Sequence, residues 1–241
     1  MRLGVTTLLA GWLLALSPAQ ADTGNAQPGI PLNSFKAVYT TAFYMGVSLN
    51  GEAIRVLKPL DNGGWSFSSE ASALMAGISE KTRFTYQPSE HIKPLSYRYH
   101  RKVLGKSRKA SVDFDWDSNR VTTVVKDTPW KMSVPEATQD KLSYQLQLRL
   151  DLMAGKTEMT YSVADGGKLK EYRFKVTGEE SIETPFGTYN AVRVMRDRGE
   201  NADRETLIWF APELDYLIVR LEQTESDGKT YALLLKNLET P

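Results

Sequence analysis

Residues 138–154, TQDKLSYQLQLRLDLMA, constrain the fold more than any other stretch of the chain. Their apolar residues alternate strictly, which is the pattern of a half-buried strand. The stretch 139–156 nevertheless contains no Val, Ile or Thr, and most of its residues are good helix formers. Gly155 stands where a helix ends, and Pro135 and Thr138 stand where one begins. We therefore predict a short helix over about 138–154.

Drawn as a helix, this stretch has apolar stripes on two different faces. One stripe contains Leu142, Leu146, Leu150 and Met153, and the other contains Tyr144, Leu148 and Leu152. A helix that is apolar on more than one side is usually buried on more than one side. The pattern predicts a helix that packs against or into the concavity of a larger structure.

The rest of the chain, from residue 35 onward, has the pattern of strands. Short runs rich in aromatic and β-branched residues follow one another, separated by turn signals such as Asn50-Gly51 and Asp227-Gly228. The sequence therefore predicts a mainly β protein, an antiparallel curved sheet or open barrel with one short central helix. The pattern leaves open whether the strands close into a barrel and whether the two β-rich halves form one sheet or two.

The first 21 residues have the three parts of a secretory signal peptide. Arg2 supplies the positive charge, an apolar run follows it, and Ala19-Gln20-Ala21 has the small residues of a cleavage site. The apolar run is about a dozen residues, short of the roughly 20 that a membrane-spanning helix needs. We expect an exported chain that is not transmembrane, with a signal peptide over 1–21, a flexible linker over 22–34 and a single β-rich domain over 35–241.

The composition excludes several classes of function. Lys and Arg number 30 and Asp and Glu number 29, so the chain has no overall attraction to nucleic acid or to an anionic membrane. There is no Cys, so the fold does not rely on disulfides and has no cysteine nucleophile. We predict no nucleic-acid partner and no cofactor.

The segment DFDWDSN is the one candidate for a metal site. Asp113, Asp115 and Asp117 recur two residues apart, as oxygen ligands do in a calcium loop. Such a loop needs Gly where Ser118 stands and Glu where Val124 stands. The three carboxylates are better read as the solvated face of a strand, and we predict no metal site.

The sequence contains no recognisable catalytic motif. The nucleophile motif G-x-S-x-G, the P-loop and the zinc motif H-E-x-x-H are all missing, and the chain has only two histidines. We expect both histidines, His91 and His100, to be exposed to solvent. No catalytic residue is predicted, and a hydrolase whose site the sequence does not reveal stays as the third alternative.

A basic hairpin is the first candidate for a functional surface. Its positive side chains, with Tyr97 and Tyr99 between them, are Arg98, Arg101, Lys102, Lys106, Arg108 and Lys109. This patch could bind anionic envelope material or an acidic envelope protein. The competing interpretation is a Lys- and Arg-rich strand that protects the edge of a sheet.

The helix itself is the second candidate. Its second stripe, Tyr144, Leu148 and Leu152, could line one wall of an apolar cavity, with Trp65, Phe67, Leu74 and Met75 on the facing sheet. The competing interpretation is a solid core in which helix and sheet leave no room for a ligand. The sequence does not decide between them.

The stretches TPFGTYNAVRVMR (184–196) and LIWFAPELDYLIVRLE (207–222) resemble a family of Gram-negative exported proteins that is classed as a domain of unknown function. Residues 96–121 and 139–152 support the resemblance, which extends from about Phe35 to the end. The chain departs from the family pattern at Ile218, where such proteins tend to have Pro. The resemblance implies a periplasmic β-rich protein and supplies no catalytic residues.

A curved sheet around one helix also looks like the fold of the periplasmic lipoprotein carriers, although a fold does not determine a function. The first hypothesis is therefore a non-enzymatic binding or carrier protein for an amphiphilic or apolar envelope molecule, such as a lipid. The second is an interaction or assembly factor of the cell envelope that binds an envelope protein through the basic hairpin.

Overall fold

A computed structural model describes residues 29–44, 48–61, 63–74, 76–88, 90–200 and 202–241. The expected signal peptide over 1–21 and the first part of the expected linker lie outside the described residues, as does Met75.

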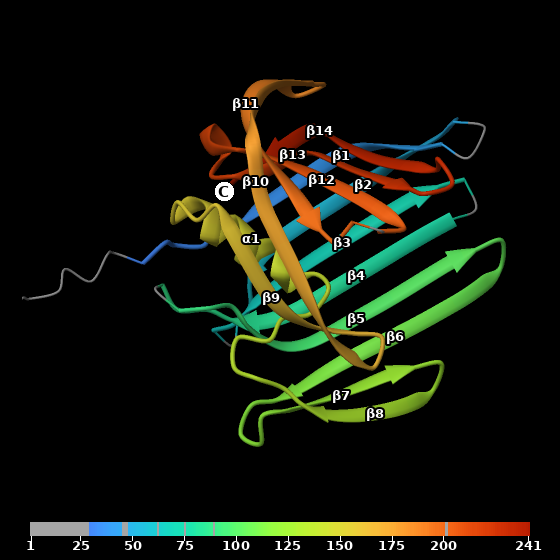
Figure 1. The fold of residues 1–241 in the computed structure, drawn as a ribbon, viewed down its shortest axis with the longest axis vertical. Helices are drawn as coiled ribbons and strands as arrows, with labels where there is room; N and C mark the ends of the chain where they lie inside the picture. The colour runs from blue at the N-terminus through green and yellow to red at the C-terminus, as the bar shows by residue number, and fades with distance from the viewer. Residues whose placement is uncertain (1–28, 45–47, 62, 75, 89, 201) are drawn as a thin grey trace, which may run out of the picture.

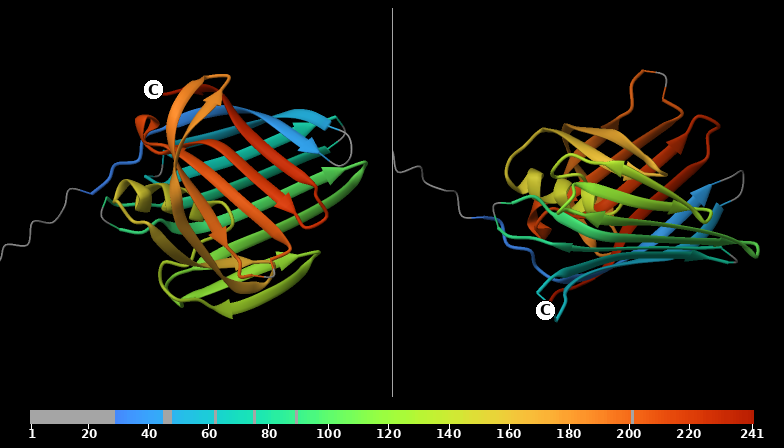
Figure 2. Two further views of the ribbon diagram at one scale, coloured as in Figure 1. Left: turned by 45° about the horizontal axis from the view of Figure 1, so that its top comes forward. Right: turned by 90° about the horizontal axis from the view of Figure 1, so that it is seen from below.

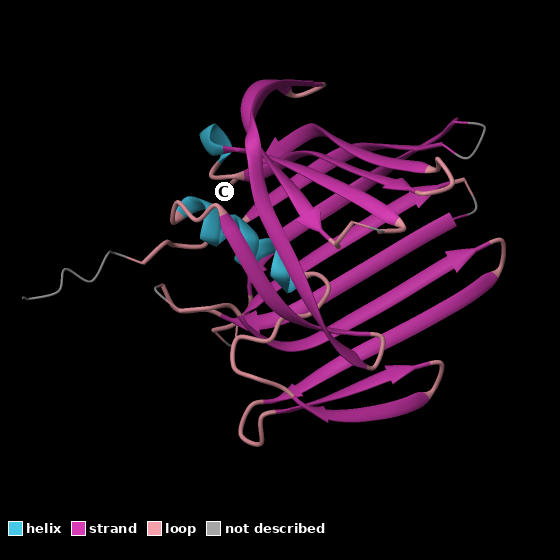
Figure 3. Cartoon of the chain, viewed as in Figure 1, coloured by secondary structure: helices cyan, strands magenta, loops and turns pink. Residues whose placement is uncertain are grey.

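The structure is one antiparallel sheet of 14 strands with a helix inside its curve (Figures 1 and 3). In chain order the strands are β1 (Phe35–Tyr44), β2 (Ser48–Pro59), β3 (Trp65–Ala73), β4 (Ala76–Thr85), β5 (Lys93–Val103), β6 (Lys106–Asp115), β7 (Arg120–Val125), β8 (Thr128–Ser133), β9 (Glu158–Asp165), β10 (Lys168–Thr184), β11 (Gly187–Asp197), β12 (Arg204–Ala211), β13 (Leu217–Glu225) and β14 (Thr230–Glu239). Helix α1 (Ser143–Met153) joins β8 to β9, and a short 3₁₀ helix, η1 (Pro212–Leu214), joins β12 to β13.

The predicted fold class is confirmed, and both questions that the sequence left open are answered. The order across the sheet is β8-β7-β6-β5-β4-β3-β2-β1-β14-β13-β12-β11-β10-β9. The two β-rich halves therefore form one sheet, joined where β1 pairs with β14. β8 and β9 are the two edges, so the strands form an open curved sheet and not a closed barrel.

The predicted helix is also confirmed, but it begins at Ser143 and not at about 138. The residues before it are held by the edge strand β9. The N–H group of Gln139 donates to the carbonyl oxygen of Ser162 at 2.8 Å, and the carbonyl of Gln139 accepts from the N–H group of Ala164 at 2.9 Å. This short bridge keeps the backbone extended at Gln139 and partly covers the edge of β9.

Asp140 organises the first turn of α1 and ties it to the sheet. Its Oδ1 atom accepts hydrogen bonds from the N–H groups of Leu142 and Ser143, both at 2.8 Å. Its Oδ2 atom accepts from the hydroxyl of Thr82 on β4 at 2.6 Å. At the other end Gly155, with φ at 79°, follows the helix as predicted, because glycine adopts positive φ without steric cost.

The two apolar stripes of α1 pack into two different cores. Leu142, Leu146 and Leu150 belong to a core with residues of β1 to β7 and of β9 to β14. Leu148 and Leu152 belong to a second core with residues of β9 to β13. Figure 2 shows the helix within the curve of the sheet. A helix in this position has no solvent-facing side of any width, which explains why both stripes are apolar.

The turn predicted at Asn50-Gly51 is wrong, because both residues lie inside β2. Gly51 pairs with Thr41 on β1, and a Cβ atom there would stand 2.2 Å from the carbonyl oxygen of Ser72 on β3. Glycine is needed at this position for close approach between strands and not for a turn.

Candidate functional site

The five residues predicted to line a ligand cavity do not surround one common space. Leu148 and Leu152 are 0 % and 3 % exposed in the second core, and Tyr144 packs against that core. Phe67 is buried in the first core, and Trp65 packs against it. Helix α1 therefore separates the two groups. Leu74, proposed for the same wall, is 85 % exposed at the end of β3.

An inner cavity of about 20 Å³ lies between α1 and the sheet. Its wall includes Phe67, and also Phe35, Tyr39, Arg55, Gln145, Leu146, Arg149, Phe210, Tyr216, Leu217 and Ile218. A volume of roughly 10–15 Å³ holds one water molecule, so the inner cavity has room for one or two small polar atoms.

Tyr39 occupies the centre of this region and stays neutral. Its hydroxyl is buried and donates to the carbonyl oxygen of Ile218 at 3.0 Å. Burial raises the pKa of Tyr39 to about 12, although Arg55 and Arg149 act in the opposite direction. The phenol is therefore protonated at neutral pH and does not neutralise the charge of either arginine.

A larger hollow of about 310 Å³, which we call the end hollow, is lined by residues that include Leu238 and Thr240 near the C-terminus. Figure 1 marks the place of the C-terminus. Its lining is Asn33, Ser34, Phe35, Arg149, Phe186, Glu213, Leu214, Asp215, Leu217, Leu238 and Thr240. Phe35, Arg149 and Leu217 line both the end hollow and the inner cavity. The two spaces are therefore adjacent, and these three side chains form the wall between them.

Two tight turns place the apolar residues of the end hollow. The turn between β10 and β11 is held by the hydroxyl of Thr184, which accepts from the N–H groups of Phe186 and Gly187, both at 3.1 Å. This leaves Phe186 37 % exposed at the hollow. On the other side, η1 brings in Leu214, and the N–H group of Asp215 closes this short helix on the carbonyl of Pro212 at 3.1 Å.

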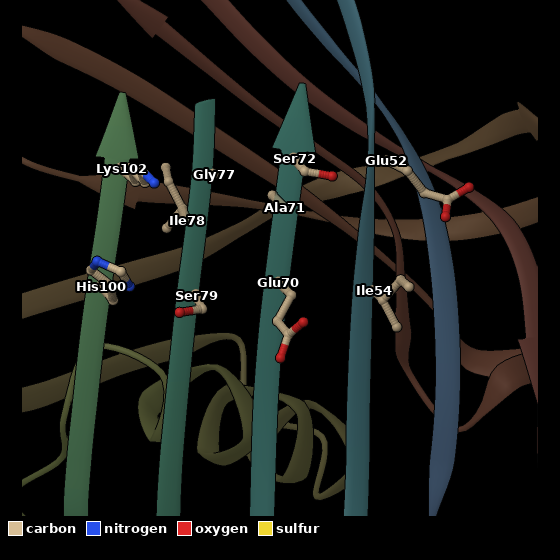
Figure 4. A pocket seen from close by; sticks show the side chains of 10 residues that line it. All are labelled: Glu52, Ile54, Glu70, Ala71, Ser72, Gly77, Ile78, Ser79, His100 and Lys102. Atoms are coloured by element: carbon tan, nitrogen blue, oxygen red, sulfur yellow. The ribbon is translucent and has the colours of Figure 1, made fainter. Parts of the chain in front are cut away.

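The polar outer face of the sheet carries two further hollows, of about 520 and 300 Å³. They share Glu70, Ser79 and His100, and we call them together the outer trough. Figure 4 shows the smaller hollow over β2 to β5, with α1 behind the strands. Gly77 and Ser79 have small side chains or none, which leaves a shallow hollow over this part of the sheet. Longer polar side chains surround the hollow (Figure 4).

The structure divides the predicted basic patch between the two faces of the sheet. Arg98, Lys102 and Lys109 line the outer trough. Arg101 on β5 pairs with Arg108 on β6, and both alternate with these trough residues along their strands, so their side chains lie on the other face of the sheet. Lys106 is the first residue of β6. All six are exposed, and Arg98 forms an ion pair with Asp113 at 2.6 Å.

Two of the three aspartates of the DFDWDSN segment, Asp113 and Asp115, have separate partners. Asp113 pairs with Arg98, whereas Asp115 accepts from the hydroxyl of Ser118 at 2.8 Å. Hydrogen bonds from Ser118 lower the pKa of Asp115. Within the described ranges, no group of three or more His, Asp or Glu residues could hold a metal ion. His91 and His100 are both exposed, as predicted.

The sequence analysis missed the residues that line the end hollow and the two buried arginines beside it. A signal for Arg55 was present, because Ala53, Arg55 and Leu57 alternate on the buried face of β2. Arg149 likewise follows Leu148 and precedes Leu150 in a helix that is buried on two sides. A single arginine on an otherwise apolar face is the pattern that could have revealed both positions.

Comparisons with known proteins assign the chain to a family and name no activity. Over residues 40–235 the chain matches the family described as "Protein of unknown function (DUF3108)". None of the curated proteins matches it. In the described part of the chain, no helix has both the length and the apolar character needed to cross a membrane.

The solved structures that are similar to this chain include the following two. One is a β-barrel-like protein of the domain of unknown function DUF1849 from Brucella abortus, with 11 % sequence identity, a TM-score of 0.58, and coverage of 87 % of this chain and 98 % of the other. The second is described as a "putative lipoprotein" from Parabacteroides distasonis, with 11 % identity, a TM-score of 0.32, and coverage of 86 % and 96 %. The first likeness shows a shared fold, and the family match, which spans most of the chain, shows that this protein belongs to the DUF3108 family.

Proposed function

We propose that this protein is a non-enzymatic binding protein of the periplasm that holds an amphiphilic or apolar molecule of the cell envelope in the end hollow. The observation that carries the proposal is the combination of apolar walls with one buried cation. Ligand sites are typically concave and mostly apolar, with a few polar groups that orient the ligand, and their volumes begin near 300 Å³. The end hollow, at about 310 Å³, fits this description with Phe35, Leu214 and Leu238 as apolar walls and Arg149 as its buried cation. Its other polar lining residues are Asn33, Ser34, Glu213, Asp215 and Thr240.

The expected signal peptide supports the location in the periplasm, and the apolar character of the end hollow supports the class of ligand. This site differs from the cavity expected from the second stripe of α1, because it opens to solvent at one end of the molecule. A ligand can therefore enter without displacing the helix from the sheet.

Native mass spectrometry tests the proposal on protein purified from its own periplasm, before and after organic extraction. We expect an added mass that extraction removes. The double variant Leu214→Glu, Leu238→Glu should lose this mass, because it places two charges in the apolar wall at positions that are only half-buried. The matched control is Leu169→Glu, an exposed leucine on β10 that is outside the end hollow, and it should retain the added mass. A clean mass for the wild-type protein would contradict the proposal.

The outer trough supports a second candidate, an interaction factor that binds an envelope protein through the exposed Arg98 and Lys102. The larger hollow, of about 520 Å³, has Lys81, Arg98 and Lys109 in its lining beside Glu70, Glu80 and Asp127, so it offers a partner charges of both signs. Reversing the charge at Arg98 and Lys102 should then reduce crosslinking to that partner without a loss of stability, since exposed ion pairs contribute about 0–1 kcal/mol. Unchanged crosslinking would exclude this candidate.

A further inference from the structure

Arg149 extends from α1 into the wall between the end hollow and the inner cavity. It is 9 % exposed, and its guanidinium carbon lies 5.2 Å from the centroid of the Phe35 ring. Its Nε atom donates to the carbonyl oxygen of Asp215 at 2.6 Å, which fixes the direction of the side chain. Its Nη1 atom is buried and forms no hydrogen bond with any described protein group.

Arg55 approaches the inner cavity from the sheet. It lies on β2, is 6 % exposed, and its guanidinium carbon is 5.7 Å from the centroid of the Tyr39 ring. Its buried Nε atom also has no hydrogen-bond partner among the described residues. The arginines that form ion pairs are elsewhere in the structure: Arg98, Arg173, Arg193, Arg204 and Arg220.

Two buried cations beside one small cavity are costly unless an anion joins them. Removing an ionised group from water carries a large penalty that only pairing offsets. Tyr39 is neutral. Burial lowers the pKa of Arg149, and Asp215, whose charge acts in the opposite direction, forms no ion pair with it. The described residues therefore place two buried cations beside these spaces, and neither cation forms an ion pair with a described carboxylate, although Glu213 and Asp215 also line the end hollow.

The size of the inner cavity indicates which anion fits. Arginine binds carboxylates and phosphates through parallel N–H donors. About 20 Å³ accommodates the one or two oxygens of a carboxylate but not the four oxygens of a phosphate. The end hollow then offers the ligand apolar side chains such as Phe35, Leu214 and Leu238, which suit a hydrocarbon chain. Its polar side chains include the exposed carboxylates of Glu213 and Asp215.

We infer that the end hollow binds a single-chain carboxylate amphiphile of the fatty-acid class, with its carboxylate between Arg149 and Arg55 and its chain against Phe35, Leu214 and Leu238. This inference rests on the proposed function and specifies the ligand for the same site. The carboxylate would supply hydrogen-bond acceptors to the Nη1 atom of Arg149 and the Nε atom of Arg55.

The test compares dodecanoate with dodecanol by isothermal titration calorimetry on the mature protein after organic extraction. At about pH 8 a carboxylic acid is ionised, so the two probes differ in charge at one end of the same chain. We expect dodecanoate to bind at least tenfold more tightly. Arg149→Gln and Arg55→Gln should each reduce this preference at least tenfold, whereas Arg220→Gln, at an ion-paired arginine over Trp209, should preserve it.

The outcomes separate this inference from the proposed function. Equal affinity for the two probes would overturn the carboxylate site and leave the apolar site in place. If neither probe bound, both the inference and the proposed function would be contradicted. If Arg149→Gln did not fold, Arg55→Gln alone would decide the matter, and circular dichroism of each variant establishes which are folded. A preference that both arginine variants retained would also overturn the inference.

Discussion

Arg55 lies on the buried face of β2, next to the apolar side chains of Ala53 and Leu57. Ala53 and Leu57, two residues away on either side, are 1 % and 0 % exposed. A buried guanidinium without a carboxylate partner carries a desolvation cost of several kcal/mol. Residues that break a local rule in this way, at a cost in stability, are concentrated at functional sites. The same reasoning applies to Arg149, whose Nη1 atom is buried without a partner.

The first prediction follows from that cost. Arg55→Met keeps much of the volume of the side chain and removes the buried charge, so we expect the ligand-free protein to gain about 1 kcal/mol or more in unfolding free energy. Urea denaturation of extracted protein measures this change. Arg173→Met, at an exposed arginine on β10, is the control and should change stability by less than about 0.5 kcal/mol. A loss of stability in Arg55→Met would indicate that the charge is compensated within the protein.

At the scale of elements, α1 is fixed to the sheet by a buried carboxylate. Burial raises the pKa of Asp140 to about 6, against hydrogen bonds from Thr82, Ser143 and Leu142 that lower it. Because this value is above the ordinary 3.8, the folded chain binds the proton more tightly than the unfolded chain does. The resulting stability is fully present below the ordinary pKa and is lost as the pH rises through 6.

Asp140→Asn removes this pH dependence and retains an oxygen that can accept from the helix N–H groups. Between about pH 4 and pH 7 we expect the wild-type protein to lose on the order of 3 kcal/mol relative to the variant. Denaturation at a series of pH values checks this. Asp113→Asn, on the exposed part of β6, should follow the wild-type curve. If the unfolding free energies of the wild type and Asp140→Asn changed in parallel with pH, the raised pKa of Asp140 would not be the source of the pH dependence.

The close packing of β1, β2 and β3 at Gly51 gives another prediction for these elements. In Gly51→Ala the new methyl group would meet the backbone oxygen of Ser72 at 2.2 Å and the hydroxyl of Thr41 at 2.8 Å. Backbone groups in a sheet cannot move away easily, so we expect a loss of about 2 kcal/mol or more in unfolding free energy.

Gly77→Ala on β4 is the matched control, because the nearest atom to its Cβ would be 3.9 Å away. That substitution should leave stability unchanged or raise it by up to about 1 kcal/mol, since it reduces the freedom of the unfolded chain. The difference between the melting temperatures of the two variants tests the interpretation, and equal values would contradict it.

At the scale of the whole molecule, the sheet is joined at its centre by the first and last strands. β1 pairs with β14 from Lys36 to Tyr44, so the centre of the sheet forms only when the two ends of the described chain meet. The end hollow depends on this pairing, because it takes Phe35 from the start of β1 and Leu238 from the end of β14. The candidate site is therefore a product of the complete sheet and not of any local motif.

The fold was largely predictable because local sequence patterns indicate its strands and its helix. The alternation of apolar residues identified strands, and the missing β-branched residues together with Gly155 identified the helix. The two stripes led by Leu142 and Tyr144 indicated correctly that this helix is buried on two sides. Each of these signals depends on residues that are close together in the sequence, so it can be recognised without knowing which distant residues are in contact.

The site was not predictable for the opposite reason. Gly51 was assigned to a turn because a dipeptide does not reveal that Ser72 lies against it. Arg55 is on β2 and Arg149 is on α1, with β3 to β8 between them in the sequence, and only the curvature of the sheet brings them to one cavity. The sequence by itself determined the class of fold and the place of the helix, through periodicity. The tertiary structure alone decided which side chains share a space, because that depends on long-range strand pairing.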